Sequence, residues 1–127
     1  MNEKQQNMRS MSFLVTAILL TALALGATGC RSHVVKVNLI NISQQPVTTI
    51  VVDYPGATFG KNQLDPGTTY LYPVKPLETG PLKIQFADAN GKTHTALGPE
   101  LHKNDEGLVE VRFDQEKAVA KLTLLNQ

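Results

Sequence analysis

Nucleophilic catalysis requires a Ser, Cys or Thr side chain that a neighbouring base activates, and this chain offers few candidates. Cys30 is the only cysteine. Beyond it, Ser32 and Ser43 are the only serines, and neither lies in a Gly-x-Ser-x-Gly motif. We therefore predict no catalytic residue and no cofactor, and we expect a protein that is not an enzyme.

Metal binding is the second chemistry to consider. His94 lies among threonines in a strand-like run, and His102 follows eight residues later in a polar segment. Imidazole and carboxylate groups bind Zn²⁺ or Cu²⁺, so His94 and His102, with Glu100 or Asp105, are weak candidates for a surface metal site. Exposed histidines without a metal are the simpler interpretation.

Four aromatic residues are candidates for a binding patch. Tyr54 and Phe59 flank the Pro55-Gly56 pair, and Tyr70 and Tyr72 fall on one face of a predicted strand. Aromatic side chains with a polar tip are enriched in binding surfaces. The glycine-containing segment 54–62 is typical of binding loops on rigid scaffolds. Packing in the core or at its rim is the alternative interpretation.

An apolar segment lies shortly before Cys30. Residues 13–25 contain no charge, no Pro and no Gly, and as a helix they would span about 20 Å. The hydrocarbon core of a bilayer is about 30 Å thick, so the segment is short for a membrane span. Lys4 and Arg9 make the preceding residues positive. This pattern predicts a helical signal peptide over residues 1–29.

The residues that follow, Ala27-Thr28-Gly29-Cys30, resemble the lipobox of bacterial lipoproteins, with Ala27 where that family usually has Leu. The resemblance implies that residues 1–29 are removed. It also implies that Cys30 carries a diacylglyceryl group on its sulfur and usually a third acyl chain on its amine. In envelopes that sort lipoproteins by the next residue, Arg31 implies the periplasmic face of the outer membrane. Two acyl chains suffice for stable attachment, so the implied partner is membrane lipid.

Two other interpretations of this segment stay open. Cys30 would be an ordinary free thiol if a secretory leader were cleaved elsewhere, after Ala24 or Ala27. Residues 11–29 would form an uncleaved single span if no cleavage occurred, and basic residues flank that segment on both sides.

The charge distribution gives no indication of nucleic-acid binding. The chain has 12 Lys and Arg against 11 Asp and Glu, and without Lys4, Arg9 and Glu3 ten of each sign remain. The two signs are interspersed and form no basic stripe.

Residues 34–127 are predicted to form one all-β domain. Strand-like runs cover residues 34–42, 47–54, 57–59, 68–74, 81–87, 93–97, 109–113 and 118–124. Turn signals separate them, among them Asp65-Pro66-Gly67 and Asp88-Ala89-Asn90-Gly91. Seven or eight short strands at this spacing predict a small antiparallel β-sandwich with Greek-key-like connections. The pattern resembles the disulfide-free Ig-like or transthyretin-like sandwiches of bacterial envelope proteins.

Several details of the strands are also predicted. Pro73 favours an edge strand, because Pro cannot donate to a ladder. In the first strand Ile40 and Ile42 change the phase of the alternation, which indicates a bulge or a strand covered on both faces. Asn41-Ile42-Ser43 matches a glycosylation sequon, which we interpret as a coincidence. The predicted core is Val35, Val37, Ile50, Val52, Leu71 or Tyr72, Ile84, Phe86, Val109, Val111, Phe113, Leu122 and Leu124.

Only Arg31, Ser32 and His33 separate Cys30 from the first strand, a reach of at most about 14 Å. We therefore expect a domain that is held close to a membrane. The function that fits best is an envelope lipoprotein that serves as a non-enzymatic binding or structural module for an unidentified envelope protein. The alternatives are a small-ligand or metal carrier that uses His94 and His102, and an accessory domain of an enzyme or envelope complex.

Overall fold

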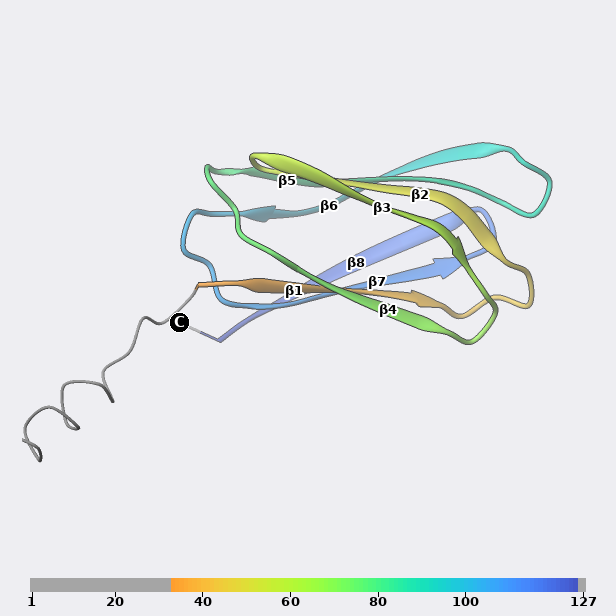
Figure 1. The fold of residues 1–127 in the computed structure, drawn as a ribbon, viewed down its shortest axis with the longest axis horizontal. Helices are drawn as coiled ribbons and strands as arrows, with labels where there is room; N and C mark the ends of the chain where they lie inside the picture. The colour runs from red at the N-terminus through yellow and green to blue at the C-terminus, as the bar shows by residue number, and fades with distance from the viewer. Residues whose placement is uncertain (1–32, 126–127) are drawn as a thin grey trace, which may run out of the picture. The chain divides into compact units, whose positions relative to one another are not determined.

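The computed structural model describes residues 33–125, which form eight β-strands and no helix (Figure 1). The strands are β1 (Val35–Asn41), β2 (Val47–Tyr54), β3 (Ala57–Leu64), β4 (Thr69–Val74), β5 (Gly80–Ala87), β6 (Thr93–Leu101), β7 (Gly107–Asp114) and β8 (Lys117–Leu124). The all-β prediction is confirmed. A search of these residues finds no helix that would reach across a bilayer. The predicted signal peptide over 1–29 and the lipid site at Cys30 lie outside the described residues.

The strands form two four-stranded sheets packed as a sandwich, as predicted. One sheet has the order β4-β1-β7-β8 and the other the order β3-β2-β5-β6. Neighbouring strands are antiparallel, with the exception of β1 and β7, which run parallel from the Val35–Gly107 pair to the Asn41–Phe113 pair. β4 is an edge strand, which agrees with the position predicted from Pro73.

The two ends of the sandwich carry different connections (Figure 1). The N-terminal end contains the start of β1, the β2–β3 turn, the β4–β5 connection, the β6–β7 connection and the end of β8. Here the Leu77 N–H donates to the Pro55 carbonyl at 3.0 Å, and the Leu125 N–H donates to the Glu106 carbonyl at 2.8 Å. The opposite end contains the β1–β2 loop, the β3–β4 turn, the β5–β6 hairpin and the β7–β8 turn.

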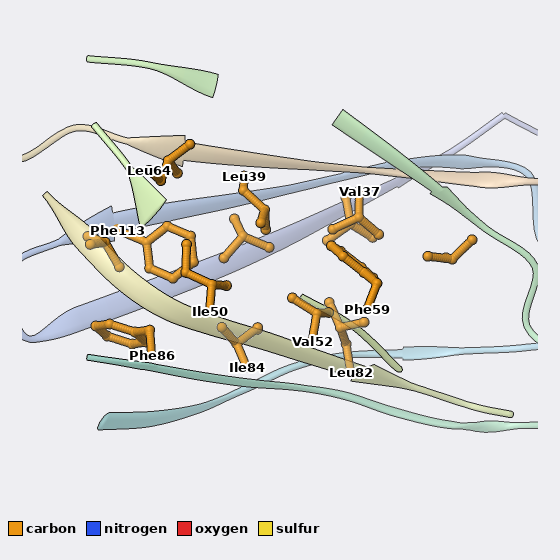
Figure 2. Close-up of a cluster of buried hydrophobic side chains, with 14 of the residues drawn as sticks. Val37, Leu39, Ile50, Val52, Phe59, Leu64, Leu82, Ile84, Phe86 and Phe113 are labelled. Carbon is orange, nitrogen blue, oxygen red and sulfur yellow. The ribbon is translucent and has the colours of Figure 1, made fainter. Parts of the chain in front are cut away.

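Alternating side chains from both sheets fill the space between them (Figure 2). The predicted core is confirmed for Val35, Val37, Ile50, Val52, Ile84, Phe86, Val109, Val111 and Phe113, all of which are buried. Tyr72 and Leu122 pack against this core and Leu124 is half-buried. Of the two alternatives Leu71 and Tyr72, Leu71 is not a core residue, because its side chain points outward from β4 and is 52% exposed. The prediction missed the buried Leu39, Val47, Phe59, Leu64, Val74, Leu82 and Leu101.

Two strands are longer than predicted. β3 does not stop at Phe59 but continues to Leu64, because it pairs with β2 along its length in a hairpin whose turn is Pro55-Gly56. Gly56 has φ +104°, as the second central residue of a type II turn requires. β6 passes through Gly98-Pro99 to Leu101, and a register shift between Pro81 and Lys83 of β5 absorbs the extra residue.

The phase change in the first strand has a different cause from the predicted one. β1 pairs with β4 and β7 without a register shift, so it has no bulge. Its outer face is not buried either, since Lys36 is exposed and Asn38 and Ile40 are half-buried. Instead, the core-facing position after Leu39 is taken by the polar Asn41, while Ile42 beyond it is 53% exposed. A bulge does occur in β2, where Thr49 (φ +51°) and Ile50 lie opposite Phe86.

Asn41 is fully buried and every polar group it carries is bonded. Its side-chain amide donates to the Gln45 carbonyl at 2.8 Å and to the Leu64 carbonyl at 2.9 Å. Its Oδ1 accepts from the Ser43 N–H and hydroxyl at 2.9 and 2.7 Å. Its backbone pairs with Gly67 and Thr68 of the β3–β4 turn. Asn41 therefore joins the β1–β2 loop to the β3–β4 turn at the opposite end. Its burial also agrees with the interpretation of the glycosylation sequon as a coincidence.

The substitution Asn41→Asp tests this junction. A carboxylate has no N–H to donate, so the Gln45 and Leu64 carbonyl oxygens would face a buried charge. We expect the free energy of unfolding to fall by roughly 3 to 5 kcal/mol. Urea unfolding followed by circular dichroism measures it. Asn62→Asp makes the same chemical change at an exposed position of β3 and should change stability by less than about 0.5 kcal/mol. Equal effects of the two substitutions would contradict the assigned role.

Candidate binding site

The four aromatic residues predicted as a patch do come together. They form a continuous row along one side of the sandwich, in the order Tyr54, Phe59, Tyr72 and Tyr70. Phe59 and Tyr72 stack with their ring centroids 4.3 Å apart and an interplanar angle of 17°. The Tyr54 ring lies 6.4 Å from Phe59, and the Tyr70 ring lies 6.5 Å from Tyr72.

The row exists because two edge strands from different sheets meet at this side. β3 is the edge of one sheet and β4 the edge of the other, and the turn at Asp65-Pro66-Gly67 carries the chain from the first to the second. Gly67 has φ +72°, which suits a tight reversal. The stacked pair of Phe59 and Tyr72 thus bridges the two edges and closes the core on this side.

Both interpretations offered by the sequence therefore apply to different members of the row. Phe59 is only 6% exposed and serves as core. The three tyrosines are half-buried and pack against the core with one part of each ring. A partner can reach only the tyrosines, so Phe59 is a support for the patch rather than a contact.

Lys61 is a fifth member that the prediction missed. Its ammonium nitrogen lies 4.7 Å from the centroid of the Tyr70 ring, a cation–π geometry. Lys61 follows Phe59 by two residues, so both side chains leave β3 on the same face. Had β3 been recognised as one continuous strand, this spacing would have indicated the contact. The row therefore combines half-exposed aromatic rings with one cation.

The histidines occupy separate places. His94 Nε2 lies 2.7 Å from Asp88 Oδ2, at the β5–β6 hairpin, and the His94 ring lies 5.3 Å from that of Phe86. His102 follows the far end of β6, where it lies 3.2 Å from Glu100 and 3.7 Å from Asp105.

A metal site that uses His94 and His102 together is wrong for this structure. The two residues are separated by the length of β6, about 26 Å at roughly 3.3 Å per residue, so one ion cannot contact both. Among residues 33–125, no three His, Cys, Asp or Glu side chains form a group that could hold a metal ion.

Asp88 organises the β5–β6 hairpin. Its Oδ1 accepts from the backbone N–H groups of Asn90 and Lys92 at 2.9 and 3.0 Å, and its Oδ2 contacts His94. The His94 contact, helped by these two backbone donors, holds the pKa of Asp88 below its ordinary value of 3.8, although burial acts in the other direction. The stretch 88–91 is therefore a tight turn, and Gly91 takes φ +78° there.

The sequence did not indicate a hollow of about 380 Å³, which lies at the end of the sandwich opposite the start of β1. Polar side chains dominate its lining, and they come from three connections: Ser43, Gln45, Asp88, Asn90, Gln115 and Glu116. The Ser43 hydroxyl is engaged within the protein, since it donates to Asn41 Oδ1 and lies 2.8 Å from the Gln45 carbonyl. The hollow thus offers hydrogen-bonding groups from loops but no activated nucleophile among them.

Comparisons with known proteins bear on the fold. No protein-family model matches the chain, and no curated protein matches it. A solved structure described as "NMR structure of the protein from Eubacterium rectale" is similar, with a TM-score of 0.54 and 15% sequence identity. The match covers 74% of this chain and 94% of that chain. At this identity the likeness concerns the fold alone.

The lowered pKa of Asp88 predicts an acid-sensitive hairpin. Because the folded state holds this proton more weakly than the unfolded chain, Asp88 stabilises the fold above about pH 4. That stabilisation is lost as the pH falls through the lower pKa of the folded state. Urea unfolding at several pH values between 7 and 2.5 should show a smaller loss in Asp88→Asn than in the unsubstituted protein. Asp114→Asn, at an exposed position in β7, should leave the profile unchanged. A profile of Asp88→Asn that matches the unsubstituted one would contradict the prediction.

Proposed function

We propose that this protein is a bacterial envelope lipoprotein, anchored through acylated Cys30, whose β-sandwich is a non-enzymatic binding or structural module. The observation that carries the proposal is a spacing. The lipobox-like Ala27-Thr28-Gly29-Cys30 ends five residues before the first residue of β1, so an anchor and a folded domain adjoin with almost no linker. Arg31 after Cys30 favours the periplasmic face of the outer membrane.

The surface proposed for binding is the aromatic row. Tyr54, Tyr70 and Tyr72 present half-buried rings backed by the buried Phe59, and Lys61 adds a cation. Rings fixed in this way lose little side-chain entropy when a partner binds, which favours them as contact residues. The partner is an envelope protein. If that partner is an enzyme or a larger complex, the domain is its accessory module through the same row.

The strand order supports a finer description of the fold. β4 returns to lie beside β1 while β2 and β3 pair in the other sheet, a neighbourhood typical of Greek-key connections. An Ig constant domain places its first strand next to its second. Here β1 lies between β4 and β7 instead. Of the two resemblances, we therefore retain the transthyretin-like one.

Cys30→Ser tests the anchor. Expression of the full chain in a bacterium fed a labelled fatty acid should give a labelled protein in the outer-membrane fraction. Cys30→Ser should carry no label and leave the membrane fraction. Ser32→Ala, two residues away, should behave like the unsubstituted chain. Absence of label on the unsubstituted protein would refute the lipoprotein assignment.

The binding surface is tested by photo-crosslinking in intact cells. A photoreactive phenylalanine analogue in place of Tyr70 should give a discrete protein adduct. The same analogue in place of Thr95, exposed on the edge strand β6, should give none. Equal adducts from both positions, or none from Tyr70, would contradict a binding role for the aromatic row.

A further inference from the structure

The first described residues are fixed to the body of the domain. His33 Nδ1 lies 2.7 Å from the carboxylate oxygen of the largely buried Glu106. The Val34 carbonyl accepts from the Gly107 N–H at 3.4 Å, just before β1 starts. Only Arg31 and Ser32 stand between Cys30 and this fixed point, so the Cα of Cys30 lies at most about 11 Å from that of His33.

Two large hydrophobic side chains are exposed at this same N-terminal end. Leu77, in the β4–β5 connection, is 60% exposed, and its backbone N–H is held by the Pro55 carbonyl. Its side chain lies over Gly56, where an added Cβ would come within 2.8 Å of it. Leu77 therefore sits on a fixed support, and its exposure is built into the fold.

Leu125 is the second. It follows β8 and is 77% exposed, and its N–H is held by the carbonyl of Glu106, whose side chain also contacts His33. The start and the finish of the described chain are thus tied to one residue. Lys75 and Glu78 flank Leu77 in sequence, and the β6–β7 connection at this end contains Lys103 and Asp105. Charges of both signs therefore occur at this end.

We propose that the N-terminal end of the sandwich rests on the surface of a lipid bilayer, with Leu77 and Leu125 at the boundary between headgroups and acyl chains. The inference deepens the proposed function, because it rests on lipid attachment at Cys30. The interfacial layer is about 5–8 Å thick on each side, from a bilayer of about 40–45 Å with a core of about 30 Å. A tether of at most about 11 Å that begins in this layer keeps His33 within about 11 Å of it, and the exposed leucines favour contact.

This orientation decides what the rest of the domain faces. The hollow at the opposite end points away from the membrane. The aromatic row runs along the side, from Tyr54 at the membrane-facing end to Tyr70 toward the opposite end. A periplasmic protein therefore reaches Tyr70 without displacing lipid.

The chain allows a direct test, because it contains one cysteine and no tryptophan. The protein beginning at Cys30 is coupled through that thiol to a maleimide lipid in phosphatidylcholine vesicles. Residues 33–125 contain the whole core and belong to a compact unit separate from the preceding residues, so this form retains the domain. Single tryptophans are introduced as Leu77→Trp, Leu125→Trp and Ile42→Trp. Ile42 is the matched control, since it is 53% exposed and follows β1 in the β1–β2 loop at the opposite end.

Coupling to vesicles should shift the emission of the tryptophans at positions 77 and 125 to shorter wavelength. Bromine on the upper acyl carbons should quench both. The tryptophan at position 42 should keep the emission it has in solution. Unshifted emission at both 77 and 125, or equal quenching at all three positions, would overturn the proposed orientation. Because the anchor here is chemical, failure of this test is distinguishable from failure of Cys30 acylation, which fatty-acid labelling reports separately. Circular dichroism of each variant shows that the fold is intact.

Discussion

The hydrogen bonds of one buried amide hold together the two places where the chain crosses between sheets at the opposite end. Asn41 donates to carbonyls of the β1–β2 loop and of β3, and its backbone pairs with the β3–β4 turn. The alternation of apolar side chains fixes which face of each strand is buried. The donors and acceptors of Asn41 have fixed directions, so they add a second constraint on how the two connections lie. Once that arrangement is set, β3 and β4 leave the junction side by side. The contact between Phe59 and Tyr72 then follows from their positions on these strands.

The two sides of the sandwich are closed by opposite means. Between β3 and β4, large stacked rings fill the gap. Between β6 and β8, small residues let the edges approach, since a Cβ on Gly98 would come within 3.2 Å of the Ala120 Cβ. Pro73, Pro99 and Lys121 on these edge strands disfavour pairing with further strands. The closure with rings leaves aromatic area at the rim of that side, and this area is the surface proposed for binding.

The number of strands, most of their positions and much of the core followed from alternation and turn residues. Leu82, Ile84 and Phe86 with the turn at Asp88–Gly91 are the clearest case.

The predictions that were wrong concern features that depend on which strands pair. β3 looked short because Gly60, Asn62 and Gln63 have no β preference, and only its ladder with β2 keeps it extended. Leu71 and Tyr72 are adjacent, and composition does not say which faces inward. The four aromatic residues named from the sequence do adjoin one another, and their role in binding stays a prediction. The contact of Lys61 with Tyr70 was missed because β3 was predicted to end at Phe59. His94 and His102 are only eight residues apart in sequence, but the extended strand β6 separates them in space.

The parallel pairing of β1 with β7 has a consequence for when the domain can form. One neighbour of β1 is β4, but its other neighbour β7 begins only at Gly107, and β8 follows β7. Contacts between residues so distant in sequence form slowly, because the intervening loop must close first. When the chain emerges from its amino end, β1 can therefore pair with β4 but lacks its parallel neighbour until β7 follows. The complete sheet can assemble only once nearly all of the chain is present.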